Sequence, residues 1–246
     1  MAALGKRSVF TSVRGQSLST RIVNQVIEAL FTRKLEPGQF LGTEAQLVET
    51  FRTSRVPIRE ALGRLEAFGA VKIKTGAGGG VTVAEGDPDQ FAIALAVQLV
   101  LIKATPAELF DARIAVECRA AELAAEHITE DELDRLQSLY DEIAKGQTGR
   151  VAVERILRFH SGIVDASRSR MLIMQMHGME HALLNTYLEA SPHHAGAAPR
   201  GYNNLKKLLE QLRQRDAEGA YATMRNHLLR QRAQVVEQLE RHSEDD

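Results

Sequence analysis

The stretch TEAQLVETFRTSRVPIREALGRLEAFG, residues 43–69, decides the fold of the N-terminal part of the chain. Its first four residues, TEAQ, fit a capping box and predict a short helix. After a tight turn a second helix begins at Ser54, whose hydroxyl can accept a bond from a first-turn N–H group. Apolar residues recur along one face of this helix, whereas Arg55 and Arg59 lie one turn apart off that face. Two guanidinium groups opposite a buried face are typical of a recognition helix in a DNA-binding helix-turn-helix.

A hairpin pattern follows this second helix. Residues 71–74 read VKIK and residues 81–83 read VTV, with the sequence TGAGGG between them. Apolar residues that alternate on both sides of a glycine turn predict a β-hairpin, here with a basic tip. The glycine run lacks the spacing of a nucleotide-binding loop and precedes a strand, not a helix. Helix, turn, helix and hairpin together predict a winged helix-turn-helix.

The motifs of this region resemble the DNA-binding domain of GntR-type bacterial transcription regulators. The resemblance covers about residues 18–85 and rests on RKLEPGQFL (33–41), SRVPIREALGRLEAFG (54–69) and GGGVTV (78–83). One departure concerns the shorter helix, which usually carries Glu-Arg early in the family and has Glu44-Ala45 here. We therefore expect one of the family's DNA contacts to be missing.

The resemblance also implies which residues contact DNA. These are Ser54, Arg55, Arg59, Thr75 and Gly76. The first three would contact operator bases or phosphates, and the last two, at the tip of the wing, would enter the minor groove. The alternative for the two arginines is a solvated helix face, but the capping box and the hairpin beside them favour DNA binding.

The composition limits the class of protein. The chain has 246 residues, enough for two domains, and 26% of them are charged, which argues against disorder. Cys118 is the single cysteine, which excludes an intramolecular disulfide framework. No signal peptide is visible, and the most apolar stretch, residues 91–102, is too short to span a bilayer. We expect a cytoplasmic protein without a membrane partner.

Charge divides the chain into two parts. Residues 1–86 contain 12 Lys and Arg and 7 Asp and Glu, a net charge of +5, and the remaining 19 basic and 25 acidic residues give residues 87–246 a net charge of −6. A basic first part and an acidic second part suit one domain that binds phosphate and one that does not. We expect a flexible basic tail over residues 1–17, the DNA-binding domain over 18–86, and a helical ligand-sensing and dimerisation domain over 87–246.

The second part reads as helical throughout. The expected helices cover about residues 89–103, 106–127, 130–145, 150–167, 170–190, 203–215 and 217–242. Short loops make neighbouring helices antiparallel, and residues 190–204, rich in Gly, Pro and Ala, predict a mobile loop. The predicted fold class is mainly α, with a winged helix-turn-helix followed by an all-α antiparallel bundle of six to seven helices.

The second part resembles the all-helical FCD domain of FadR-like GntR regulators. The motifs that carry this resemblance are ELFDARIAVECRAAELAAEH (108–127), RFHSGIVDAS (158–167) and RDAEGAYATMRNHL (215–228). It implies a homodimer that binds a two-fold symmetric operator, and a small organic acid, a carboxylate or sugar acid, bound inside the helical domain.

Arg113 and Glu117 lie four residues apart on an apolar helix stripe. Charges on an apolar face are costly unless they are paired. One interpretation is a structural Arg–Glu pair that holds helices together. The other is that Arg113 binds a carboxylate ligand in bidentate fashion, and the resemblance favours this second interpretation.

His160 and His227 also lie on apolar stripes, where a histidine is most often a hydrogen-bonded core residue. Many sensing domains of this family hold a divalent metal with one Asp and three His, and these two histidines match two of the four positions. Ile156 and Leu205 occupy the other two. Two imidazoles fall short of the three protein ligands that a metal site normally needs. We therefore expect no metal or other cofactor, and histidines that hydrogen-bond an organic ligand directly.

A second histidine pattern, His177-x-x-Glu180-His181, fits the H-x-x-E-H signature of zinc peptidases. Five-residue patterns recur by chance, so a histidine that faces the ligand is the more plausible interpretation, and His193 and His194 are expected to be exposed. The expected effector-binding residues are Arg113, Glu117, His160, His181 and His227.

These features predict a protein that is not an enzyme. The expected function is that of a sequence-specific, DNA-binding transcription regulator, in this family most often a repressor, whose operator affinity depends on a bound organic acid. Two alternatives remain open at this point: a zinc-dependent hydrolase built on the H-x-x-E-H pattern, and an architectural DNA-binding protein without a ligand.

Overall fold

The computed structural model describes residues 17–76, 78–86, 88–146, 148–190 and 199–245. It divides into two compact units, Met1–Asp87 and Pro88–Asp246, which are described separately here. The basic tail predicted for residues 1–17, apart from Ser17, and the histidine pair at 193–194 lie outside the described residues.

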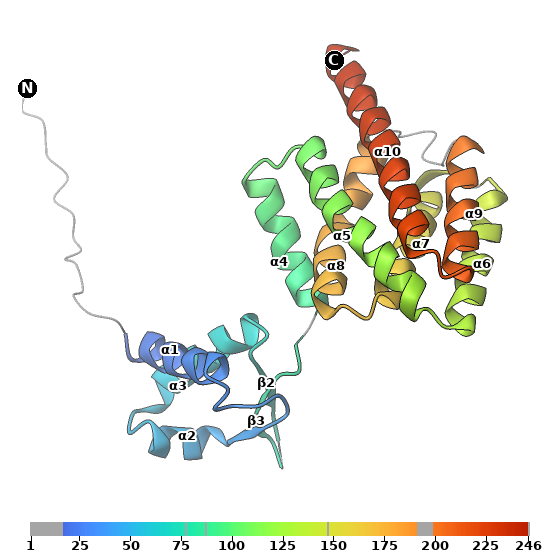
Figure 1. The fold of residues 1–246 in the computed structure, drawn as a ribbon. Coiled ribbons are helices and arrows are strands. Elements are labelled where there is room, and N and C mark those ends of the chain that lie inside the picture. Colours follow the sequence, from blue (N-terminus) through green and yellow to red (C-terminus); the bar gives the residue numbers. More distant parts are fainter. Residues whose placement is uncertain (1–16, 77, 87, 147, 191–198, 246) are drawn as a thin grey trace, which may run out of the picture. The chain divides into compact units, whose positions relative to one another are not determined.

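The first unit combines three helices with a small sheet (Figure 1). The elements are α1 Leu18–Phe31, β1 Phe40–Gly42, α2 Glu44–Thr50, α3 Arg55–Ala67, β2 Val71–Lys74 and β3 Gly80–Val83. The antiparallel sheet has the order β1-β3-β2, so the predicted hairpin of β2 and β3 carries an additional strand on its far edge. The structure therefore confirms the winged helix-turn-helix.

The helix starts of this unit follow the sequence signals in part. The capping box at Thr43 forms, because its hydroxyl accepts from the Gln46 N–H at 3.3 Å and the Gln46 side chain accepts from the Thr43 N–H at 2.8 Å. Ser54 occupies the N-cap of α3, but its side chain makes no capping hydrogen bond, so that detail of the prediction is wrong. The apolar face of α3 is buried as predicted, with Ile58 and Leu65 at most 1% exposed.

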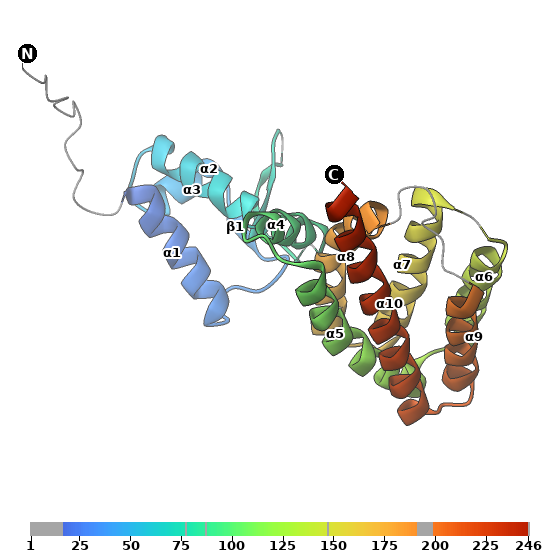
Figure 2. The same cartoon turned by 90° about the horizontal axis from the view of Figure 1, so that it is seen from above.

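The second unit is a helical bundle (Figures 1 and 2). Its seven helices in the described part of the chain are α4 Pro88–Leu101, α5 Pro106–His127, α6 Glu130–Ala144, α7 Gly149–Ala166, α8 Arg170–Ala190, α9 Pro199–Arg213 and α10 Ala217–Asp245. Helix α5 lies against α7, α8, α9 and α10, and α4 packs on α8. The mainly α fold class is confirmed. The loop prediction for residues 190–204 is wrong for 199–204, because α9 already begins at Pro199, and a first helical turn tolerates proline.

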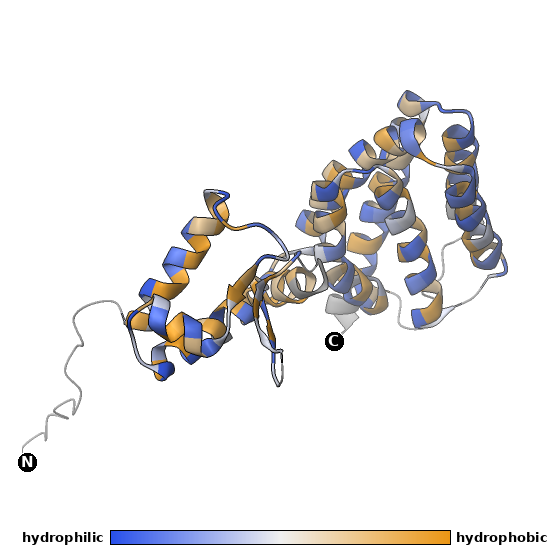
Figure 3. Ribbon diagram, turned by 90° about the horizontal axis from the view of Figure 1, so that it is seen from below, coloured by the Kyte–Doolittle hydropathy of each residue, from blue (hydrophilic) through white to orange (hydrophobic). Residues whose placement is uncertain are grey.

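Apolar and polar residues alternate around most helices of the bundle (Figure 3), as amphipathic helices require. The largest core cluster joins residues of α5, α6, α7, α9 and α10, such as Phe159, Leu205 and Met224. No helix among the described residues combines the length and the hydropathy that crossing a membrane requires.

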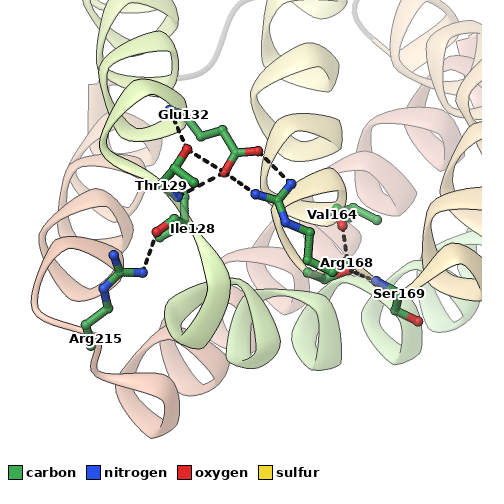
Figure 4. A network of polar contacts seen from close by, with 8 residues as sticks. Ile128, Thr129, Glu132, Val164, Arg168, Ser169 and Arg215 are labelled. Carbon is green, nitrogen blue, oxygen red and sulfur yellow. Dashed lines mark hydrogen bonds and ion pairs between the residues drawn. The ribbon is translucent and has the colours of Figure 1, made fainter.

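Two arginines fix the ends of bundle helices (Figure 4). Arg168, after α7, donates to both carboxylate oxygens of Glu132 at 2.7 and 2.8 Å, and Glu132 also accepts from the Thr129 N–H in the capping box of α6. Arg215, between α9 and α10, donates to the Ile128 carbonyl at 2.5 Å, where α5 ends. These bonds satisfy polar groups at helix ends and fix the frame around the buried residues of α5.

Candidate functional site

The recognition helix exposes the side chains that the sequence predicted. Ser54, Arg55 and Arg59 are all exposed, while the opposite face of α3 is buried in the core of the unit. Thr75 and Gly76 follow the end of β2 and are exposed as well. The structure thus leaves each of the five predicted DNA-binding residues accessible to a duplex.

Arg59 has a partner that sequence reasoning missed. Its Nε lies 3.0 and 2.9 Å from the two carboxylate oxygens of Glu44, at the start of α2, while the Arg59 side chain stays 67% exposed. The Nη1 and Nη2 atoms take no part in this pair. The available signal was the sequence Glu44-Ala45, in which alanine stands where the family usually has an arginine.

A buried polar cluster lies in the bundle and includes four of the five predicted effector-binding residues. Arg113 and Glu117, one turn apart on α5, form an ion pair with both side chains fully buried. His160, on α7, places Nδ1 2.5 Å from the second oxygen of Glu117. The His227 ring of α10 stacks on His160 with the ring centroids 5.2 Å apart. One carboxylate therefore holds a guanidinium and an imidazole.

Two further residues complete the cluster and were not predicted as site residues. Tyr187 of α8 accepts from Arg113 Nη1 at 2.5 Å and donates to Gln231 of α10 at 2.8 Å. Gln231 also accepts from Arg113 at 3.3 Å. Arg113 thus pairs with Glu117 on its own helix and also connects α5 to α8 and α10. It therefore has the structural role of holding helices together.

The charge state of the cluster follows from these contacts. Burial raises the pKa of Glu117, but Arg113 and His160 outweigh it and bring that pKa to about 2. Burial lowers the pKa of His160, and Arg113 lowers it further, although Glu117 opposes both effects. Burial and the neighbouring His160 hold the pKa of His227 well below its usual value. These shifts favour an Arg113–Glu117 ion pair beside two uncharged imidazoles.

Three nitrogen atoms of the cluster lack partners. Among the described residues, five buried side-chain nitrogen or oxygen atoms have no hydrogen bond, and three of them are Arg113 Nη2, His160 Nε2 and His227 Nε2. Each unpaired buried polar atom costs about 1–3 kcal/mol. Water or a ligand with several polar atoms would remove this cost.

The residues present do not fit the family's metal. Ile156 and Leu205, at two of the four expected ligand positions, are hydrophobic and 8% and 1% exposed. No group of three His, Cys, Asp or Glu side chains with metal-binding geometry occurs within the described ranges. The Glu117 carboxylate is engaged by Arg113 and His160 Nδ1, so the described residues offer a metal two imidazoles, fewer than a protein metal site normally uses.

The H-x-x-E-H residues serve other purposes. Glu180 accepts a hydrogen bond from Ser161, and His177 lies half-buried, 3.9 Å from Asp165. His181 is exposed on α8, so the structure does not bring it together with the other four predicted effector-binding residues. The inner face of α8 at this level is formed by Gly178, Met179 and Leu183.

The two units together define a DNA-binding protein with a winged helix-turn-helix and an all-helical second domain. Comparison with protein families agrees: the family described as "Bacterial regulatory proteins, gntR family" matches residues 18–81, and the FCD domain matches residues 108–230. The chain belongs to the GntR family of bacterial transcription regulators and carries an FCD domain.

Relatives and solved structures are consistent with this assignment. The chain is 32% identical over 157 residues to the HTH-type transcriptional regulator LutR of Bacillus subtilis. The matched region covers 63% of this chain and 71% of LutR. It is 27% identical to the putative L-lactate dehydrogenase operon regulatory protein of Escherichia coli, over 86% of this chain and 83% of that protein. The structure of Streptococcus agalactiae GntR covers 87% of this chain and 99% of its own, at 19% identity with a TM-score of 0.57, and shares the fold.

Proposed function

We propose that the protein is a homodimeric, sequence-specific repressor in the cytoplasm, and that a small carboxylate bound at the polar cluster controls its affinity for a two-fold symmetric operator. The observation that carries this proposal is the trio of buried, unpartnered nitrogen atoms on Arg113, His160 and His227. The hydrolase and the architectural DNA-binding protein have no comparable support.

A carboxylate suits the cluster because Arg113 has a free Nη2 donor beside Tyr187 and Phe110, both of which face its guanidinium. Charge-assisted hydrogen bonds from guanidinium to carboxylate are among the strongest in proteins. Glu117 already balances the charge of Arg113, so we expect His227 to take up a proton when a second anion binds beside it. One relative is named as a regulator of an L-lactate dehydrogenase operon, and L-lactate is a small carboxylate.

Ligand control of DNA binding requires a physical route from the cluster to the helices. The cluster joins α5, α7, α8 and α10 through side chains, so a ligand that replaces or adds to these bonds favours one packing of these helices over another. A ligand shifts operator affinity only by the difference in its own affinity for the two arrangements.

The test is a gel-shift assay with DNA from upstream of the protein's own gene, in the presence and absence of a panel of carboxylic and sugar acids. We expect the wild type to bind, Arg59→Ala to lose operator preference, and one or more acids to change the affinity. Arg113→Gln combined with Glu117→Gln, which removes both charges together, should bind the operator without responding to acids. Arg119→Gln, on an exposed residue of the same helix, is the control and should behave as wild type. A wild type that binds none of the acids contradicts ligand control.

A further inference from the structure

A large apolar side chain of the recognition helix points away from the core. The buried face of α3 holds Ile58, Leu62 and Leu65, which are at most 8% exposed. Val56, in the first turn of the same helix, is 65% exposed. Successive residues of an α-helix are about 100° apart, so positions nine apart point in opposite directions. Val56 stands nine residues before the buried Leu65, and its side chain therefore projects straight outward from the unit.

Val56 lies beside the two arginines that we expect to contact DNA. It follows Arg55 directly and precedes Arg59 by three residues, at the N-terminal end of α3. In helix-turn-helix proteins the N-terminal residues of the recognition helix reach the base edges in the major groove. A single exposed valine is ordinary on a protein surface, but this valine occupies the part of the helix that enters the groove. A duplex that contacts both arginines therefore covers Val56 as well.

A valine distinguishes base pairs by the polarity of their edges. Thymine alone among the four bases carries a methyl group in the major groove, and the other groups that tell base pairs apart there are hydrogen-bond donors and acceptors. An amino group of cytosine or adenine covered by a valine would lose water without gaining a partner, which is costly. Contact with the thymine methyl instead removes apolar surface from water on both sides.

We propose that Val56 is a specificity-determining residue that contacts the methyl group of a thymine in each operator half-site. This inference rests on the proposed function, namely that the protein binds a specific operator. The three residues from Val56 to Arg59 rise about 4.5 Å along the helix, compared with about 3.4 Å between neighbouring base pairs. The thymine therefore lies within about two base pairs of the base that we expect Arg59 to contact.

The experiment compares thymine with uracil, which lacks only the methyl group. Each thymine of one operator half-site is replaced in turn by deoxyuridine, and fluorescence anisotropy with the full-length protein measures the ratio of the affinities for the two duplexes. We expect one thymine whose replacement weakens binding of the wild type about fourfold. This factor corresponds to the about 0.8 kcal/mol that burial of one CH₂-sized group contributes.

Variants of Val56 assign the methyl contact to this side chain. Val56→Ser, which replaces the apolar branches by a hydroxyl, should reduce the ratio at that thymine to about one. Val56→Ile keeps an apolar side chain and should preserve the ratio. Val151→Ser, at an exposed valine of α7, is the matched control and should behave as wild type. Circular dichroism should give the same helix content for all of these proteins, because both valines are exposed.

The outcomes separate this inference from the proposed function. Equal affinity of the wild type for every thymine and uracil duplex overturns the methyl contact and leaves a sequence-specific regulator. A Val56→Ser variant that retains the wild-type ratio assigns the methyl contact to another residue and overturns the role of Val56. Equal binding of the wild type to the operator and to unrelated DNA overturns the proposed function itself.

Discussion

Arg59 is an exposed cation whose orientation is fixed by an acidic neighbour. Glu44 holds Nε with both of its oxygens, which restrains the plane of the guanidinium group. The two terminal nitrogens remain for a bidentate contact with O6 and N7 of a guanine, the commonest specific contact of arginine in the major groove. We therefore expect Glu44 to affect which base is read more than how tightly DNA is held.

Replacing Glu44 by alanine should reduce discrimination between the operator and single-base variants at the guanine that we expect Arg59 to contact. The loss should be a part of the about 1–3 kcal/mol that a bidentate Arg–guanine contact contributes. Fluorescence anisotropy measures the affinity for the operator and for each single-base variant. The ratio of these two affinities is independent of the general gain in DNA affinity that follows from deleting a negative charge. Glu49→Ala, an exposed glutamate on the same helix, is the matched control. Equal ratios for both variants would contradict a positioning role.

Four members of the polar cluster were predictable because charged or imidazole side chains recur on apolar helix stripes, where they need partners. Tyr187 and Gln231 were not, because both fit an ordinary helix and their contact joins residues 44 apart in the sequence. The exposure of His181 was not predictable, because its spacing from His177 is a property of one helix, whereas its exposure depends on how α8 is packed.

At the scale of elements, α4 and α8 approach each other closely at Gly178. A Cβ atom on this residue would lie 2.7 Å from Leu95 Cδ2 and 2.8 Å from Phe91 Cε1. Both atoms are ends of flexible side chains and Phe91 is 41% exposed, so they can shift; this shift offsets the gain in helix propensity, and Gly178→Ala should change the stability of the second unit by less than about 0.5 kcal/mol. Gly63→Ala, at an exposed helical position of α3 where a Cβ meets nothing within 4 Å, should instead stabilise its unit by about 0.4–1 kcal/mol. Urea unfolding followed by circular dichroism measures both, and equal effects would show that α4 and α8 are not in contact in solution.

Glu132, near the N-terminus of α6, is expected to contribute to stability in a way that is lost in acid. Hydrogen bonds from Arg168 and from Thr129 bring the pKa of Glu132 to about 2, below the 4.5 of the unperturbed side chain. The folded state therefore binds fewer protons in this interval, and stability present above pH 4.5 is lost as the pH falls towards 2. Urea unfolding between pH 2.5 and 6 should show that the free energy of unfolding changes less with pH in Glu132→Gln than in the wild type. Glu130 is an exposed residue of the same turn, and Glu130→Gln should keep the wild-type pH dependence of the free energy of unfolding. A Glu132→Gln variant with the wild-type pH dependence would contradict the contribution assigned to Glu132.

Helix boundaries were the most predictable elements, because local signals set them. Thr105 and Thr129 both form capping boxes, and the helices they begin extend to within a residue or so of the predicted ends. Strand β1 was not predictable, since it has three residues, ends in glycine and exists through its pairing with β3. The start of α9 was missed because Gly and Pro in residues 190–204 resemble a loop, although Pro199 stands where a helix tolerates it.

For the molecule as a whole, the proposed coupling of carboxylate and operator must be reciprocal. If an acid weakens operator binding by a given factor, the operator must weaken binding of that acid by the same factor, and couplings of this kind are typically about 5–150-fold. Calorimetric titration of the acid into free protein and into the protein–operator complex should give this factor, with DNA that lacks the operator as the control. Unequal factors would show that the acid acts on DNA or aggregation and not through a linked equilibrium.

The sharing of Glu117 by Arg113 and His160 has a consequence for anyone who wishes to turn this regulator into a biosensor. A library that randomises Glu117 would disturb recognition and the interior of the bundle at once, so most of its members would be lost as misfolded chains. Diversity is better placed at Ile156, Leu205 and Met224, buried apolar residues of the bundle core, where side-chain size can be varied while Glu117 is kept.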